Sequence, residues 1–225
     1  MQGPDIFGIV SAVMAGIPVT LLLTAFGLSF GFLLGLLLAI VRVYSKDFGF
    51  IAEGYEKLVR GIPVLVIIYI LYFGFLNTIT FLPEIARAFF SASLALGIAS
   101  AAFQSQIIRG AILSVNPGQI MAARSIGMSN RQALLHVVLP QALRLALPAW
   151  SNEYALVIKD AAFASAIGIA DMVRLARNYY ANEPAFLFIA YVVVALVYLV
   201  LTYPVTHHLG ERQTRKLARI GLGGK

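Results

Sequence analysis

Three ionisable side chains, Glu153, Lys159 and Asp160, interrupt an apolar stretch at about 142–170 of this chain. Charged residues inside a membrane-spanning segment are costly, so they are functional candidates by default. On a helix, Glu153 and Asp160 are seven positions apart and face the same way, whereas Lys159 lies about 120° around the helix from Glu153. No acidic residue stands three or four positions from Lys159, so a same-helix salt bridge is not available to it.

A lysine and an acidic side chain at this place could bind a small zwitterion. An amino acid carries one carboxylate and one ammonium group, and electrostatic attraction is strong where the dielectric constant is low. Two other interpretations stay open. Lys159 and Asp160 could pair with other helices or another subunit and hold a bundle together, or both could extend to water from an interfacial position.

Polar residues in a second apolar stretch extend this candidate site. Ser100 and Gln104 are four positions apart, so they share one helix face. Either side chain could hydrogen-bond a bound amino acid or only a neighbouring helix. The predicted substrate-binding residues are therefore Lys159, Asp160, Glu153, Ser100 and Gln104.

The residue types predict no catalytic site and no metal site. The chain contains no cysteine, and its three histidines lack the spacing of metal ligands. It has no Gly-x4-Gly-Lys-Ser/Thr phosphate loop, no His-Glu-x-x-His and no Gly-x-Ser-x-Gly. We therefore expect a protein that binds and moves a solute without being an enzyme.

Composition indicates that membrane helices must position these residues. Of 225 residues, 60% are hydrophobic and 12% charged, and the mean hydropathy is +0.86. A soluble domain carries roughly 25% charged residues, so an ordinary globular enzyme and a disordered chain are excluded. Since a spanning helix needs about 20 apolar residues, we predict an all-α polytopic membrane protein with five transmembrane helices. The apolar stretches are about 14–41, 62–81, 88–113, 142–170 and 186–209.

Charge distribution predicts the orientation of these spans. Basic residues gather in cytoplasmic loops, and thirteen of the 17 fall in the segments 42–60, 109–144 and 210–225. The opposite set of loops holds only Arg87, Arg174 and Arg177. The N-terminus should therefore face outward and the C-terminus the cytoplasm. This asymmetry also explains the net charge of +7, and no basic run with interleaved aromatics suggests nucleic acid.

Two further residue sets carry structural expectations. Gly27, Gly31 and Gly35 recur every four positions in the first stretch, and small residues at that spacing let two helix backbones touch. Arg60 and Arg109 fall at predicted cytoplasmic helix ends, where they would anchor the orientation or, alternatively, take part in a gate or an ion pair.

The predicted cytoplasmic loop at about 114–140 has the pattern of two short helices. Asn116 and Gln119 form a candidate capping box, with Pro117 in the first turn and Gly127 as a stop. Ser129 and Gln132 form a second box, starting a helix that should end near Pro140. Ile120, Ala123 and Ile126 would form an apolar stripe on the first helix. Such a helix either lies on the bilayer surface or docks into a groove of a cytoplasmic partner.

This loop resembles the "EAA" loop of ATP-binding-cassette (ABC) importer permeases, closest to the branch for polar amino acids of the His/Glu/Gln/Arg type. The similar segments read GQIMAARSIGMS at 118–129 and VVLPQA at 137–142. Further similar segments are 55–65, 109–119, 152–168 and 210–212, and together they follow the family's order over about residues 10–215. The chain departs from the family pattern in three places: Met121 stands for the loop glutamate, Gln106 for another glutamate, and Ala161-Ala162-Phe163 for Thr-Ser-Leu.

The resemblance implies a single permease domain, 1–225, with the MetI-like type I importer fold. It implies that the loop docks on a separate ATPase through Gln119, Met121, Ala122, Ala123, Arg124 and Gly127. The partners would be two ATPase copies, a second permease of the same or another kind, an extracytoplasmic amino-acid-binding protein and membrane lipid, with no nucleic acid. ATP and Mg would belong to the ATPase, and this chain would hold no cofactor. The expected location is the prokaryotic cytoplasmic membrane, with several passes.

The expected function is therefore amino-acid translocation by alternating access, driven by ATP in the partner. A second hypothesis is an ion-coupled secondary transporter in which Glu153 and Asp160 carry protons or sodium. Such transporters usually show an internal repeat, and none is apparent here. A third is a structural membrane anchor, which would tolerate Lys159→Ala in transport but not Arg124→Glu in assembly.

Overall fold

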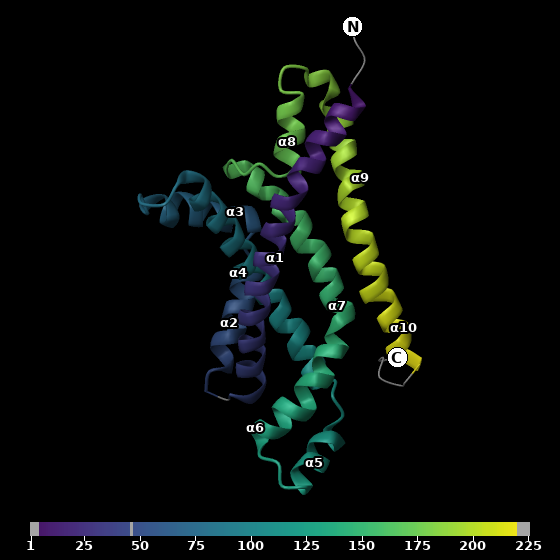
Figure 1. The fold of residues 1–225 in the computed structure, drawn as a ribbon. Coiled ribbons are helices and arrows are strands. Elements are labelled where there is room, and N and C mark those ends of the chain that lie inside the picture. Colours follow the sequence, from purple (N-terminus) through teal and green to yellow (C-terminus); the bar gives the residue numbers. More distant parts are fainter. Residues whose placement is uncertain (1–4, 46, 220–225) are drawn as a thin grey trace.

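The computed structural model describes residues 5–45 and 47–219, and every regular element within those ranges is a helix. Lys46 and Lys225, counted above among the basic residues, lie outside them. Four helices are long and apolar enough to span a bilayer, and a bent pair makes a fifth if it counts as one span. The four are α1 (Ile6–Tyr44), α4 (Glu84–Leu113), the continuous run Asn130–Ile167 and the run Pro184–Arg215. Figure 1 shows them as an elongated bundle.

The bent pair replaces the straight second span that hydropathy predicts. The segment 49–60, expected as loop, is helix α2 (Gly49–Arg60), which packs beside α1 and α4. After it the chain turns by 99° into α3 (Val64–Tyr69) and the π-helix η1 (Ile70–Phe75). Pro63 lies at the turn. Its missing N–H and its ring prevent α2 from continuing past it. Hydropathy locates the apolar helix after Pro63, as predicted, but neither α2 nor the bend.

The predicted glycine contact is confirmed between α1 and α4. A Cβ added at Gly31 would lie 2.8 Å from the Ser100 Cβ, and one at Gly35 would lie 3.0 Å from the Ala101 carbonyl oxygen. A Cβ at Gly27 would lie 2.8 Å from the Leu96 Cβ. Because these three glycines have no side chain, α4 packs directly on the backbone of α1. This contact brings Ser100 and Gln104 of α4 against α1.

The loop between α4 and α7 (Leu139–Asp160) begins with α5 (Pro117–Ser125), as predicted. The Asn116 side chain accepts from the Gly118 N–H, so it is a simple cap and not the box with Gln119 that the sequence suggests. Gly127 has φ +87° and ends the turn. The capping box of Ser129 is confirmed at α6 (Asn130–Ala133).

The second short helix does not end near Pro140, contrary to the expectation. It continues through the π-helix η3 (Leu134–Val138) into α7. Pro140 lies in the first turn of α7, where a proline is tolerated. One helical rod therefore runs from the loop to the 3-10 helix η4 (Ala161–Ile167).

The helices after η4 include short ones at the opposite end of the bundle and the long run that contains α9 (Figure 1). They are α8 (Met172–Tyr179), η5 (Pro184–Phe186), the apolar α9 (Leu187–Val205), the π-helix η6 (Thr206–Glu211) and α10 (Arg212–Arg219). The beginning of α1 packs against α8 and α9 through Ile9 and Val13. In Figure 1 this end lies opposite α5. The predicted separation of the N-terminal segment from the loop is thus observed, and the orientation in a membrane stays a prediction.

Candidate functional site

A chain of hydrogen bonds joins α4, α7 and α1 in the interior of the bundle. The Ser100 hydroxyl donates to Glu153 Oε1 at 2.6 Å, and the Gln104 amide donates to the Ser100 Oγ at 2.9 Å. The same amide donates to the Leu28 carbonyl at 3.1 Å, while Trp150 Nε1 donates to the Gln104 Oε1 at 3.0 Å. Ser100, Gln104 and Glu153 are all buried. Because buried polar groups are costly when unpaired, this network holds each of the three side chains in one position.

Glu153 keeps one carboxylate oxygen unpaired. Its Oε1 accepts from Ser100, whereas Oε2 has no protein donor among the residues that the structure describes. Glu153 also lines a cavity of about 200 Å³. Pockets for drug-sized molecules measure roughly 300–1,000 Å³, so this cavity fits a smaller solute. The Glu153 Oε2 atom therefore keeps its capacity to accept a hydrogen bond.

The cavity has one basic and three other polar side chains in an apolar wall. Arg60, at the end of α2, lies on one side, and its guanidinium carbon is 5.1 Å from the centre of the Phe103 ring. The packing of α2 on α4 places Arg60 there, and the bend at Pro63 keeps the start of α3 beside the same cavity. The lining residues are Val59, Arg60, Ile62, Pro63, Val64, Leu96, Ala99, Ser100, Phe103, Glu153, Leu156, Val157 and Asp160.

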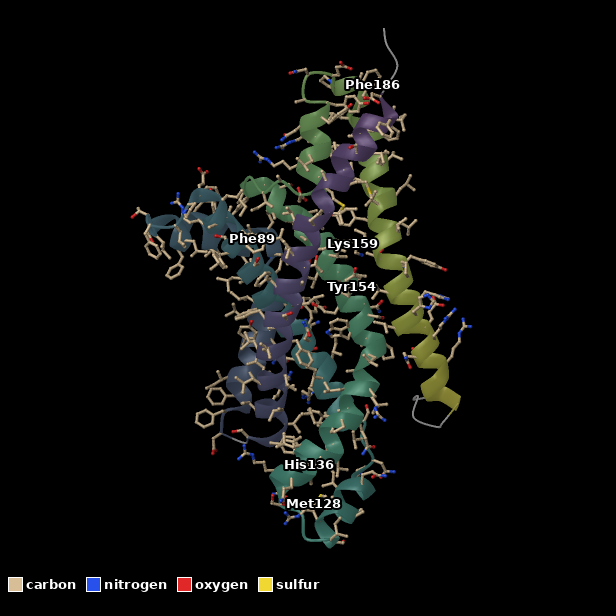
Figure 2. The ribbon with its side chains drawn as sticks, in the orientation of Figure 1. Phe89, Met128, His136, Tyr154, Lys159 and Phe186 are labelled. Carbon is tan, nitrogen blue, oxygen red and sulfur yellow. The ribbon has the colours of Figure 1, made fainter. Side chains whose placement is uncertain are left out.

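Three of the five predicted substrate-binding residues meet at this cavity, and two do not line it. Ser100, Glu153 and Asp160 line it, as expected for two acidic residues seven positions apart on a helix. Gln104 lies behind Ser100 and fixes it. Lys159 is exposed and is not among the lining residues. In Figure 2 it lies on α7 beyond Tyr154.

A second buried cluster, around Glu56, was missed from sequence. Glu56 is fully buried and pairs with Arg42 of α1. It also accepts from the Ser105 hydroxyl at 2.6 Å and from the Gln106 amide at 3.1 Å. The available signal was spacing: Ala52, Glu56 and Val59 fall on one helix face. That signal applies only if the segment is a helix, and hydropathy predicts a loop there.

Most of the predicted ATPase-contacting residues lie on the outer surface of the loop. Gln119, Met121, Ala122, Arg124 and Gly127 are exposed, whereas Ala123 is buried. The side chain of Met121 is 65% exposed and that of Ile126 is 76% exposed. The predicted apolar stripe is therefore divided, because Ile120 and Ala123 face the bundle and only Ile126 points outward.

Within the described residues, no three His, Cys, Asp or Glu side chains come together in a group that could hold a metal ion. The Glu211 carboxylate lies 3.0 Å from His207 Nδ1 and 3.7 Å from Arg215 Nη2. This contact accounts for the position of His207.

Comparison with known proteins places these features in a family. The family described as "Binding-protein-dependent transport system inner membrane component" matches residues 31–215. The octopine transport system permease protein OccQ of Rhizobium meliloti is 35% identical over 215 residues, covering 89% of this chain and 87% of that protein. The probable glutamine ABC transporter permease protein GlnM of Bacillus subtilis (strain 168) is 34% identical over 197 residues, covering 87% of this chain and 89% of that protein.

Solved structures share the fold. A crystal structure of an amino acid ABC transporter with histidines has a TM-score of 0.80 and 33% identity, and the match covers 95% of this chain and 100% of that one. The MetNI methionine ABC transporter in an inward-facing conformation has a TM-score of 0.72. Its identity of 18%, over 93% of this chain and 98% of that one, indicates a common fold alone.

Proposed function

Because the chain belongs to the family of binding-protein-dependent transport system inner membrane components, we propose that it is the permease subunit of an ABC importer that carries a polar or charged amino acid into the cell. Relatives are named for octopine, nopaline, glutamine and cystine transport. These solutes all carry the ammonium and carboxylate groups of an amino acid or groups derived from them. The family does not favour an ion-coupled secondary transporter.

The cavity beside Glu153 is the observation that carries this proposal. Arg60, Glu153 and Asp160 all line this small volume. The guanidinium suits a planar carboxylate, which it can bind through two parallel hydrogen bonds. Glu153 Oε2 and Asp160 suit an ammonium group. Ser100 and Gln104 hold the Glu153 carboxylate in position, and Lys159 stays a predicted contact whose exposed position favours a neighbouring helix or subunit.

Coupling to ATP hydrolysis is assigned to the loop around α5. Gln119, Met121, Ala122, Ala123, Arg124 and Gly127 would form the surface that docks on a separate ATPase, present in two copies. Met121 and Ile126 supply exposed apolar side chains for it. Arg124 donates to the Met128 carbonyl at 3.1 Å and thereby holds the turn after α5. ATP and Mg belong to that partner, and this chain takes part by binding and movement.

The continuous rod from α6 to η4 supplies a mechanical link between loop and cavity. Glu153 lies 23 positions after Asn130, about 35 Å along a helix. A movement of the loop with the ATPase would therefore shift Glu153 and Asp160, which lie on the same rod. Alternating access follows if this shift opens the cavity to one side of the membrane at a time.

The complex is proposed to act in the prokaryotic cytoplasmic membrane as one permease unit, residues 1–225, with the N-terminal end outward. A second permease, identical or not, completes the pathway, and an extracytoplasmic binding protein delivers the amino acid. The test is uptake into proteoliposomes that contain the permeases with or without the ATPase. ATP-dependent uptake that needs the binding protein supports the proposal, whereas uptake driven by an ion gradient without the ATPase contradicts it.

A further inference from the structure

The short helix α10 carries all of its basic residues on one face. Its eight residues include four basic ones, at positions i, i+3, i+4 and i+7, which are Arg212, Arg215, Lys216 and Arg219. Since each residue turns a helix by 100°, these four positions fall within an arc of about 100°. Arg212 is exposed, and the side chain of Arg215 is 74% exposed. α10 therefore has one basic face.

Little negative charge opposes this basic face. Glu211 is the one acidic residue in the sequence from Thr206 to Arg219, and its carboxylate lies 3.7 Å from the Arg215 guanidinium. An open groove of about 710 Å³ separates α10 and η6 from α7, and Pro148 lines it. Arg144 is exposed on α7 one helical turn before Pro148, so it adds a further positive charge on that side. This part of the molecule therefore suits a partner that carries negative charge.

α10 lies where the headgroup layer of a bilayer would be. The apolar helix α9 has 19 residues and no charged side chain, so its length of about 28 Å matches the roughly 30 Å of the hydrocarbon core. Arg212 comes seven positions after Val205, the last residue of α9, which is about 10 Å along a helix. Because a helical Cα–Cβ bond tilts towards the N-terminus, the side chains of Arg212 and Arg215 start back towards α9 and the bilayer.

The ATPase is an unsuitable neighbour for α10, because α10 lies far from the docking loop. A Cβ added at Gly210 would lie 2.7 Å from the Ser151 Oγ, so the start of α10 is level with Ser151 on α7. Ser151 comes 21 positions after Asn130, about 30 Å along the helical rod that begins at α6. The nine residues from Gly210 to Arg219 span only about 14 Å. α10 therefore ends roughly 15 Å short of α6, and Figure 1 shows α5 at the far end of the loop.

We propose that the basic face of α10 binds the headgroups of anionic phospholipids in the cytoplasmic leaflet. The inference rests on the predicted orientation and on the proposed function, which places the chain in the cytoplasmic membrane. Four basic residues just after a spanning helix are typical of such a contact, because each is attracted to the negative membrane surface. A guanidinium also suits a lipid phosphate, to which it can donate two parallel hydrogen bonds. Since η6 packs on α7, the lipid contact holds a segment that lies beside the helix of Glu153.

Fluorescence quenching in the assembled complex tests the contact. The chain has no cysteine, so Gln213→Cys on α10 allows one fluorophore to be attached to it before assembly. The complex is placed in vesicles of equal parts phosphatidylglycerol and phosphatidylcholine, in which one lipid or the other carries a nitroxide quencher. Quenching by phosphatidylglycerol should be at least threefold stronger at low salt. This preference should largely disappear at 1 M salt, where charges are screened beyond about 3 Å. Equal quenching by the two lipids at low salt would overturn the proposal.

Charge-removing variants show whether the basic face causes the preference. Arg212→Gln combined with Arg215→Gln should reduce the preference for phosphatidylglycerol by at least half. The matched control combines Arg131→Gln on α6 with Arg177→Gln on α8, which also removes two exposed positive charges but leaves α10 intact. The control should keep the full preference. An undiminished preference in the first variant, or equal losses in both, would contradict the proposal.

The same labelled complex separates the membrane from the ATPase as the neighbour of α10. A fluorophore that neither lipid quenches, and that the ATPase shields from iodide in the water, identifies the ATPase and overturns the proposal. ATP-driven uptake separates this inference from the proposed function. Uptake without a phosphatidylglycerol preference rejects the headgroup contact alone. A preference in a complex that never shows ATP-driven uptake supports the headgroup contact and rejects the proposed function.

Discussion

The Ser100 hydroxyl donates a 2.6 Å hydrogen bond to Glu153 Oε1, joining two helices at residues 53 positions apart in the chain. Ser100 is itself held by the Gln104 amide, and Gly31 lies directly against both side chains. The carboxylate is thus oriented by three neighbours from two helices. Its second oxygen stays available at the cavity, which makes Glu153 the side chain whose charge matters most for the proposed transport.

Glu153→Gln should therefore lower the initial rate of ATP-driven uptake by about tenfold or more, since a hydrogen bond to a charged group is worth roughly 1.5–3 kcal/mol. Glutamine keeps the shape of glutamate and can still accept from Ser100, so the complex should assemble. Glu183→Gln is the matched control, because this carboxylate is exposed and lies outside the cavity lining. Equal losses in both variants would argue against the assignment of the cavity.

Gly31→Leu should prevent the close contact of α1 with α4. A Cβ at Gly31 already lies 2.8 Å from the Ser100 Cβ and 2.9 Å from Gln104 Nε2. The folded yield and the melting temperature of the detergent-purified permease should both fall sharply. Gly54→Ala provides the control in α2, where no atom lies within 4 Å of the added Cβ. It should stabilise the protein by about 0.5–1 kcal/mol, as alanine does in a helix interior.

Glu56→Ala should destabilise the folded permease by roughly 3–5 kcal/mol, because it leaves the largely buried Arg42 without its main partner. Glu53→Ala removes a carboxylate that also pairs with Arg42, at 3.5 Å, but is 42% exposed. That loss should stay below about 1 kcal/mol. Thermal denaturation of the two variants measures the difference, and similar melting temperatures would show that the Glu56 cluster is not structural.

Met121→Asp should weaken binding of the permease to its ATPase by about tenfold or more. Burying one large apolar side chain contributes roughly 1.5–3 kcal/mol, and Met121 is exposed on α5. Ile126→Asp should act in the same way. Ser114→Asp, at an exposed position before α5, should leave the affinity unchanged. Affinity is measured by titration of the detergent-purified permease with the isolated ATPase, and unchanged binding in all three variants would contradict the docking surface.

Asp171→Asn should raise stability at pH 8 and leave it unchanged at pH 4. Asp171 caps α8 by accepting from the Arg174 N–H at 2.9 Å, while its Oδ2 is buried without a partner in the described part of the chain. Burial raises the pKa of Asp171 from 3.8 to about 6, against the backbone N–H of Arg174. Because the pKa of Asp171 is higher in the folded state, its contribution to the free energy of unfolding is fully present below pH 3.8. That contribution is lost as the pH rises through about 6.

Asparagine caps the helix equally well and does not ionise, so the gain at pH 8 should approach 3 kcal/mol, about 1.4 kcal/mol for each unit between the two pKa values. Melting temperatures across pH 4–8 measure it. A wild-type stability that rises between pH 4 and 6 would show that Asp171 is paired in the folded protein.

The sequence by itself determined those features that depend on residues close together in the chain. Hydropathy identified a membrane protein, because a long helix in lipid needs an apolar surface along its whole length. The ends of α5 and the start of α6 followed from Asn116, Gly127 and Ser129, because a cap acts on backbone groups two or three positions away. The glycine spacing on α1 likewise predicted a close helix contact, although not that α4 makes it.

Tertiary structure alone decided which polar side chains meet. Glu56 is buried because Ser105 and Gln106, about 50 positions later, come to lie against it. The packing of α2 on α4 brings Arg60 to the cavity, and the packing of α7 leaves Lys159 outside it. Burial and the pairing of charges depend on contacts between distant segments, and these form only when helices pack, so the pattern within any one segment does not contain them.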